Sequence, residues 1–181
     1  MTSGPGTLLT VGHGAVDQDR LTGMLTSAEV EAVVDIRRFP GSRVHPHVAR
    51  EALEEWLPAH RISYMWEPRL GGRRRLPEDS QSPDTWWTVQ AFRAYAGHTR
   101  TAEFAAALDQ VLEQATRRTV AVMCSESVWW RCHRRLVADV AFLAHGIPVL
   151  HVMPGGRMAP HRPAAGARVQ PDGLLIWDGE R

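Results

Sequence analysis

The chain of 181 residues is 44% hydrophobic, which is enough for one globular domain with a sizeable core. Its 21 basic residues, all arginine, are nearly balanced by 20 acidic ones, and this net charge of +1 excludes nucleic-acid binding driven by overall charge. No signal peptide, membrane-spanning run or lipidation motif is visible, and there are two cysteines. We therefore expect a cytoplasmic protein with reduced thiols and no membrane partner.

Apolar, β-branched runs alternate with amphipathic segments throughout the chain. The first strand is followed by the glycine turn Gly12–Gly14 and by a helix that ends near Ser27. Thr99 or Thr101 is expected to cap the helix before the fourth strand, and Gly146 to end the helix after it. Strands are predicted at residues 7–11, 32–37, 61–66, 119–124 and 148–152, with further helices at about 48–60, 86–97, 104–115 and 132–143.

This alternation predicts a single domain over residues 1–181 with an α/β, Rossmann-like, doubly wound fold. The expected core is a mainly parallel five-stranded sheet with helices on both faces, and residues 174–177 could add a short edge strand. The segment 67–84 is expected to be a long loop, and 154–172, rich in Pro, Gly, Ala and Arg, a loose one.

Three sets of polar residues are predicted to meet at one edge of this sheet. In a doubly wound sheet the first and fourth strands are neighbours where the chain reverses direction. Their carboxyl ends carry Gly12 and His13 on one strand and residues 124–126 on the other. On the second strand, Asp35 and Arg37 share one face. We therefore expect all three sets to surround one ligand-binding crevice.

A polar turn connects the fourth strand to the helix that begins at Cys132, His133 and Arg134. The N–H groups of a glycine turn and of a helix N-terminus can bind phosphate, and arginine adds bidentate contacts. The expected partner is therefore a phosphate-containing small molecule or a nucleic acid. The residues predicted to bind it are Gly12, His13, Arg37, Ser42, Gly71, Gly72 and Arg134, with Arg73–Arg75 as a further phosphate contact.

Five motifs resemble the DUF488 family, a set of small proteins named for unknown function. Gly14 departs from the family, which usually has serine there. The resemblance implies an α/β Rossmann-like fold and no particular activity, so function must be inferred from the site. The motifs are Thr10-Val-Gly-His13, Val34-Asp35-Ile-Arg37-x-x-Pro40-x-Ser42, Leu70-Gly71-Gly72, Cys124-x-Glu126 and Cys132-His133-Arg134.

Carboxylate catalysis is the first chemical hypothesis. Glu126 and Asp35 would flank the crevice, and His133 would help to set their protonation. One carboxylate could act as nucleophile or general base while cations hold a phosphate. Such a pair fits hydrolysis of the glycosidic bond of a nucleoside, nucleotide or nucleic acid, because a nearby negative charge stabilises an oxocarbenium-like transition state.

Other hypotheses remain open. The protein could bind a nucleotide or nucleic acid without catalysis, or Cys124 could be the nucleophile of a phosphatase or sulfur-transfer enzyme. A phosphatase with arginine five residues beyond its nucleophile does not fit, because Trp130 stands there and Arg131 comes one position late. Cys124, Cys132 and His133 are only three of the four ligands that structural zinc needs. We therefore expect neither a metal nor a cofactor.

Overall fold

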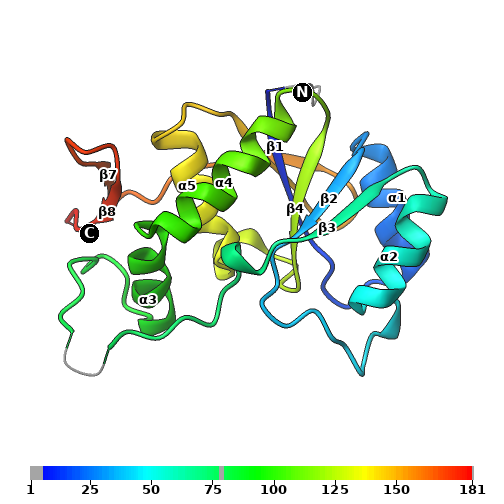
Figure 1. Cartoon of the computed structure of the whole chain (residues 1–181), viewed down its shortest axis with the longest axis horizontal. Helices are drawn as coiled ribbons and strands as arrows, with labels where there is room; N and C mark the ends of the chain where they lie inside the picture. Colours follow the sequence, from blue (N-terminus) through cyan, green and yellow to red (C-terminus); the bar gives the residue numbers. More distant parts are fainter. Residues whose placement is uncertain (1–5, 78–79, 181) are drawn as a thin grey trace.

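Six strands form the main sheet, in the order β3-β2-β4-β1-β5-β6 (Figure 1). The computed structural model describes residues 6–77 and 80–180. Strands β1 to β5 run parallel, and β6 pairs antiparallel with β5, which confirms the predicted α/β fold with a mainly parallel sheet. The strands are β1 (Leu8–Gly12), β2 (Ala32–Asp35), β3 (Ser63–Trp66), β4 (Val120–Cys124), β5 (Val149–Val152) and β6 (Met158–Pro160).

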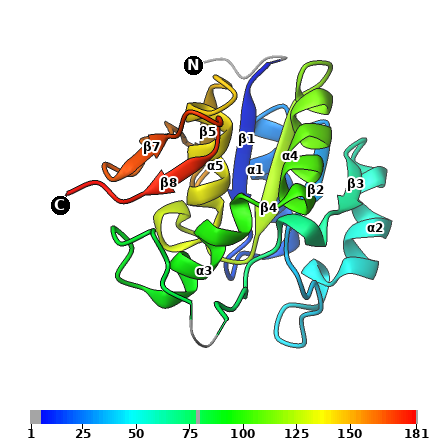
Figure 2. The ribbon, with the colours of Figure 1, turned by 60° about the vertical axis from the view of Figure 1, so that its left-hand side comes forward.

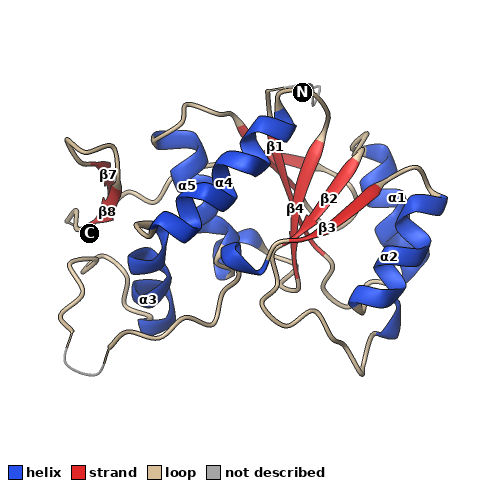
Figure 3. Ribbon diagram, in the orientation of Figure 1, coloured by secondary structure: helices blue, strands red, loops and turns tan. Residues whose placement is uncertain are grey.

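Helices cover both faces of the sheet, as Figure 2 shows from the side and Figure 3 by element type. Helices α1 and α2 pack on one face, and α3, α4 and α5 lie on the other. The central strands β1 and β4 are buried along their whole length, as expected for parallel strands covered on both sides. The α-helices are α1 (Gln18–Ser27), α2 (Arg50–Ala59), α3 (Gln90–Thr99), α4 (Ala102–Ala115) and α5 (Arg134–Leu143), and short 3₁₀ helices occur at η1 (Pro46–Val48), η2 (Pro68–Leu70) and η3 (Trp129–Arg131).

Local signals explain several helix ends. The side chain of Thr101 accepts a hydrogen bond from the backbone N–H of Phe104 and so caps α4, one of the two expected caps. Gly146 follows α5 with a φ of +66°, the left-handed conformation expected of a glycine there. Helix α3 starts later than predicted, because Asp84 fixes the preceding segment by pairing with Arg100.

The C-terminal segment is more regular than the sequence suggested. The stretch expected to be loose contains β6 and also β7 (Ala167–Val169). Strand β8 (Leu175–Trp177) pairs with β7 in a separate two-stranded sheet, so the prediction of an edge strand on the main sheet was wrong. The hairpin is anchored because Trp177 is fully buried and its indole N–H donates to Asp139 on α5. Among the helices that the structure describes, none has the length and apolar character needed to cross a membrane.

Candidate functional site

The carboxyl ends of β1 and β4 lie side by side, as predicted. Gly12 is in register with Cys124, and the backbone N–H of His13 donates to the carbonyl of Cys124 at 3.0 Å. A Cβ atom on Gly12 would lie 1.8 Å from the carbonyl oxygen of Glu126, so only glycine allows the two loops to approach. Gly14, where serine was expected from the resemblance, has a φ of +52°, which favours glycine.

A pocket of about 360 Å³ opens at this edge of the sheet, and we call it the thiol pocket. It brings together residues from the ends of β1, β2 and β4 with the start of α5 and Gly72, which follows η2. Among the residues that the structure describes, its lining includes several histidines and arginines and no carboxylate. They are His13, Gly14, Arg37, Arg38, Phe39, Gly41, Ser42, His45, Gly72, Arg73, Cys124, Ser125 and His133.

Two sulfur atoms and one imidazole nitrogen meet at the wall of the thiol pocket. The Sγ atoms of Cys124 and Cys132 and the Nδ1 atom of His133 all lie within 4.8 Å of one another. Nδ1 is 3.8 Å from Cys124 Sγ and 3.6 Å from Cys132 Sγ. Cys124 and His133 line the pocket, whereas Cys132 is buried behind them.

The two thiols are not equivalent. A hydrogen bond from the thiol of Cys132 lowers the pKa of Cys124 well below its usual range; burial opposes this effect, and His133 and Arg134 reinforce it. Burial raises the pKa of Cys132, and the adjacent Cys124 raises it further. The backbone N–H of Arg134 donates to Cys132 Sγ at 3.5 Å, at the N-terminus of α5. The surroundings therefore favour the ionised form of Cys124 over that of Cys132.

Close packing fixes the imidazole of His133. A Cβ atom on Gly72 would lie 2.9 Å from His133 Nδ1, so this glycine lets the chain pass directly over the ring. The ring of Tyr95 packs at a centroid distance of 5.0 Å. A Cβ on Gly71 would meet the backbone nitrogen of Arg38 at 2.9 Å. Both glycines thus allow close packing beside the pocket, and their predicted phosphate contact stays a prediction.

The carboxylate of Asp35 is fully hydrogen-bonded to other groups of the protein. It accepts bonds from Arg37 Nε at 2.8 Å, Arg37 Nη2 at 2.6 Å and the hydroxyl of Tyr64 at 2.8 Å. Although burial opposes charge on Arg37, Asp35 raises the pKa of the guanidinium. Arg37 Nη2 also donates to the carbonyl of Val48, and Nη1 lies 3.3 Å from His13 Nε2. Only one N–H of Nη1 is then left for a ligand.

His13 is held in one tautomer by the same network. Its Nδ1–H donates to the carbonyl of Gly14 at 2.9 Å, so Nε2 is free to accept from Arg37. Burial lowers the pKa of His13, and the charge of Arg37 acts in the same direction. His13 is therefore neutral and positions Arg37 beside the pocket.

Glu126 and Arg134 do not line the thiol pocket. Arg134 is 1% exposed and donates to Thr10 Oγ1 at 3.1 Å and to the carbonyl of Glu126. The carboxylate of Glu126 accepts a long bond of 3.5 Å from the N–H of Val128 in its own turn. The geometry therefore does not place Glu126 and Asp35 across one crevice, and it gives Arg134 a role in fixing the loop after β4. Ser42 does line the pocket, where its hydroxyl accepts from the N–H of His45.

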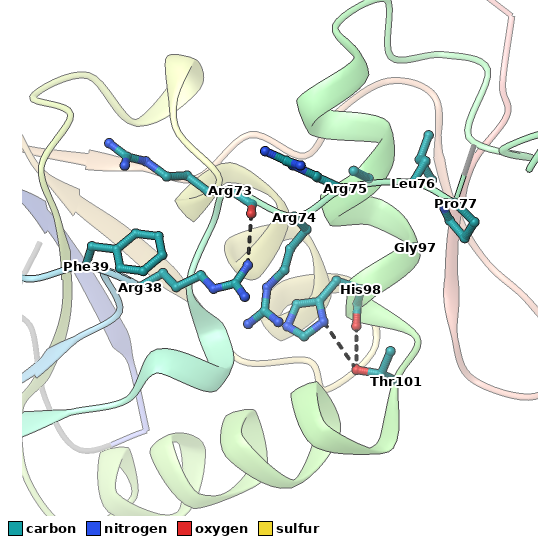
Figure 4. Close-up of a pocket in the computed structure, with 11 residues that line it drawn as sticks. Arg38, Phe39, Arg73, Arg74, Arg75, Leu76, Pro77, Gly97, His98 and Thr101 are labelled. Carbon is teal, nitrogen blue, oxygen red and sulfur yellow. Dashed lines mark hydrogen bonds between the residues drawn. The ribbon is translucent and has the colours of Figure 1, made fainter.

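An arginine groove of about 1000 Å³ adjoins the thiol pocket (Figure 4). The two cavities share Arg38, Phe39 and Arg73. Figure 4 shows the side chains of Arg38 and Arg74 reaching toward His98. The pKa of His98 is lowered by burial and also by these two arginines, which shows how closely the charges gather. The groove is lined by Arg38, Phe39, Arg73, Arg74, Arg75, Leu76, Pro77, Ala94, Gly97, His98 and Thr101.

A buried chain of hydrogen bonds behind the site was not predicted. Arg134 donates to the hydroxyl of Thr10, which bonds to His151 Nδ1 at 2.7 Å. His151 Nε2 lies 3.0 Å from His161 Nδ1, and His161 Nε2 lies 2.8 Å from the carboxylate of Asp139. Every donor in this chain faces an acceptor if both histidines are neutral. A histidine within the otherwise apolar strand β5 was the available sequence signal.

The sulfur cluster offers three of the four ligands of a structural zinc site. Thiolate and imidazole are ligands that zinc prefers, and the sulfur–nitrogen distances of 3.8 and 3.6 Å suit a tetrahedral site. Only Cys124, Cys132 and His133 belong to this cluster within residues 6–77 and 80–180. The Nε2 atom of His133 has no hydrogen-bond partner in that part of the chain, although zinc-binding histidines usually have one.

Fold and site together define an α/β protein with two neighbouring free cysteines at the carboxyl edge of a parallel sheet. The model of the family described as domain of unknown function DUF488 matches residues 17–141. The chain therefore belongs to the DUF488 family. The matched range contains β2, β4 and the sulfur cluster and begins after the Gly12–Gly14 turn. No curated protein and no solved structure matches the chain.

Proposed function

We propose that this protein is a cysteine-dependent enzyme that acts on a small anionic ligand, with Cys124 as the nucleophile. The observation that carries the proposal is the Cys124 sulfur in the wall of a pocket lined by arginines and, among the described residues, by no carboxylate, with a second thiol and an imidazole nitrogen within 4.8 Å. Cysteine is the most reactive protein nucleophile once it is ionised, and the thiol of Cys132 lowers the pKa of Cys124 here. The sequence had left chemistry at Cys124 open as an alternative, and the geometry favours it.

Each neighbouring residue has a role in this proposal. Arg38 and Arg73 at the mouth of the thiol pocket attract the anion, and one N–H of Arg37 remains for a direct bond. The imidazole of His133, whose Nδ1 atom lies 3.8 Å from Cys124 Sγ, stabilises the ionised form of Cys124. Ser125, whose hydroxyl is 4.0 Å from Cys124 Sγ, is near enough to contact a bound ligand.

Sulfur transfer fits the site better than phosphate-ester hydrolysis. A cysteine phosphatase surrounds one phosphate with loop N–H groups and an arginine five residues after its nucleophile. Here that position is Trp130, Arg131 is exposed, and Arg134 is buried against Thr10. The carboxylate hypothesis is also less favoured, because Asp35 is fully bonded to its neighbours.

Binding of a nucleotide or nucleic acid is a second candidate, favoured by the arginine groove. Phe39 is 62% exposed, and the guanidinium carbons of Arg38 and Arg73 each lie 5.7 Å from its ring. An exposed aromatic ring among arginines is a suitable platform for a base next to its phosphates. A nucleotide in the groove would direct its phosphate toward the thiol pocket, because the two cavities share these residues.

The proposal is tested with three variants and a panel of substrates. Wild type, Cys124→Ser and Glu126→Gln are assayed for sulfur transfer from thiosulfate to cyanide, for hydrolysis of p-nitrophenyl phosphate, and for release of base from nucleosides and oligonucleotides. We expect Cys124→Ser to lose any activity found by at least about a hundredfold, and Glu126→Gln to retain it. An active Cys124→Ser variant together with an inactive Glu126→Gln variant would contradict the proposal and restore the carboxylate hypothesis.

A further inference from the structure

The position of Cys132 behind Cys124 indicates that it has a role of its own. Cys132 is 4% exposed and does not line the thiol pocket, so a ligand in the pocket does not meet it directly. Its sulfur nevertheless lies within 4.8 Å of Cys124 Sγ. The route from Cys132 to any substrate therefore passes through the sulfur atom of Cys124.

We propose that Cys124 and Cys132 form a redox-active dithiol that reduces small anionic disulfides and closes to an intramolecular disulfide. The inference rests on the proposed function in one respect, namely that Cys124 is the nucleophile. It adds a substrate class, disulfides that carry negative charge, and it gives Cys132 the role of the resolving thiol.

The chemistry takes two displacements at sulfur. The Cys124 thiolate attacks one sulfur of R–S–S–R, so a Cys124–S–S–R bond forms and the first R–S⁻ leaves. Cys132 then loses its proton to solvent or to the released thiolate, attacks Cys124 Sγ, and displaces the second R–S⁻. The dithiol is oxidised by two electrons and the substrate disulfide is reduced by two, giving two R–SH and one protein disulfide. An external dithiol restores the enzyme by the reverse exchange.

The first step prepares the second. While Cys124 is a thiolate, its negative charge and the hydrogen bond between the sulfurs keep Cys132 protonated. A mixed disulfide on Cys124 removes that charge. The N–H of Arg134 still donates to Cys132 Sγ at the N-terminus of α5, where a thiolate is favoured. Formation of the adduct thus turns Cys132 from a hydrogen-bond donor into a nucleophile.

Closing the disulfide requires a local movement. A disulfide needs a sulfur–sulfur distance of about 2.05 Å, shorter than the present separation. Cys124 is the last residue of β4, which is hydrogen-bonded to strands on both sides. Cys132 lies between η3 and α5 with an extended backbone, at φ −123° and ψ 151°. The movement therefore falls on the segment that contains Cys132.

The arginines of the thiol pocket select the substrate. Arg38 and Arg73 at its mouth favour carboxylate-bearing disulfides such as glutathione disulfide or the reagent DTNB, whose thiol product is coloured. The charges of these arginines do not favour the binding of a neutral disulfide of similar size. We expect DTNB to react at least about tenfold faster than a neutral dipyridyl disulfide of matched leaving-group reactivity, and the ratio to fall in Arg73→Ala or at high salt.

The experiment counts thiol release and retained adduct on the full chain, after metal analysis and in the presence of EDTA. We expect wild type to release two equivalents of coloured thiol, one for each of its two cysteines, and to retain none, with an intramolecular disulfide found by peptide mapping. Cys132→Ser should release one equivalent and retain a stable mixed disulfide on Cys124. Cys132→Ala serves as a second variant, and circular dichroism checks that each is folded.

The outcomes separate this inference from the proposed function. Wild type that retains a stable adduct on Cys124, as Cys132→Ser does, overturns the dithiol and leaves Cys124 as a nucleophile. Labelling that goes to Cys132 and is unaffected by Cys124→Ser overturns both proposals. A stoichiometric metal ion in the purified protein that must be removed before either thiol reacts overturns the dithiol in favour of a metal site on the same three ligands.

Discussion

The histidine at the centre of the buried hydrogen-bond chain should make the protein sensitive to acid. His151 is fully buried on β5, with Thr10 bonded to one ring nitrogen and His161 to the other. Burial, followed by His161 and Arg134, lowers its pKa to about 2. The imidazole is therefore neutral in the folded protein at every pH in ordinary use.

The sign and size of the effect follow from proton linkage. Histidine in an unfolded chain has a pKa of about 6.5. Above that value His151 binds a proton in neither state, so its contribution to the free energy of unfolding is fully present. Below it the unfolded chain binds a proton that the folded protein does not bind. The free energy of unfolding therefore decreases as the pH is lowered, until the pKa of the folded protein is reached. The loss is about 1.4 kcal/mol for each pH unit, or about 2 kcal/mol at pH 5.

The measurement compares urea unfolding of wild type and His151→Gln at about pH 7.5 and about pH 5. The variant removes the titrating group, so it should lose about 2 kcal/mol less than wild type on acidification, whatever its own stability. His13 and His98 also have lowered pKa values, and their effects cancel because both proteins contain them. His60→Gln, at the exposed end of α2, is the matched control and should behave as wild type. An equal acid loss in wild type and His151→Gln would refute the reasoning.

The remaining predictions concern the loops, the thiolate and the groove. Gly12→Ala should lower the free energy of unfolding by at least about 1–3 kcal/mol, because its Cβ meets a backbone oxygen, whereas Gly23→Ala in the open middle of α1 should be neutral or stabilising; equal effects in thermal melts would argue against the tight crossing of the two loops. Asp139→Ala should cost about 3–5 kcal/mol by leaving the buried donors of His161, Ala164 and Trp177 unpaired, and a loss as small as that of the exposed Asp109→Ala would contradict it. The pH midpoint for modification of Cys124 by iodoacetamide should lie well below that of a free cysteine, because the thiol of Cys132 lowers the pKa of Cys124; a midpoint at the ordinary value of about 8.5 would contradict this. Arg73→Ala should weaken the binding of a fluorescent mononucleotide at low salt, and Arg117→Ala on the far end of α4 should not; identical affinities would remove the groove from consideration.

The order of elements and the neighbourhood of the site could be predicted from the sequence. Buried strands such as β4 are read directly from continuous apolar runs, and helix α4 from its apolar stripe and the Thr101 cap. Because crossover connections in parallel sheets follow strict rules, these local signals also predicted that Gly12 lies beside Cys124. The motifs that carry the family resemblance include Gly12 and Cys124, which lie at this same edge of the sheet.

The roles of the polar residues were decided only by tertiary structure. A sequence shows that Asp35 and Arg37 share a face, but not that they bond to each other and to Tyr64 from a neighbouring strand. In the same way, nothing local distinguishes Glu126, whose carboxylate turns away into its own loop, from a residue that faces the ligand.

The ionisation of the two thiols is also decided by tertiary structure. Cys124 and Cys132 are separated by a turn whose path no local propensity specifies, and their pKa values diverge only because folding brings one sulfur against the other at the start of α5. Hydrogen bonds and burial act over a few ångströms between residues distant in the chain, so the fold alone could determine which group is reactive.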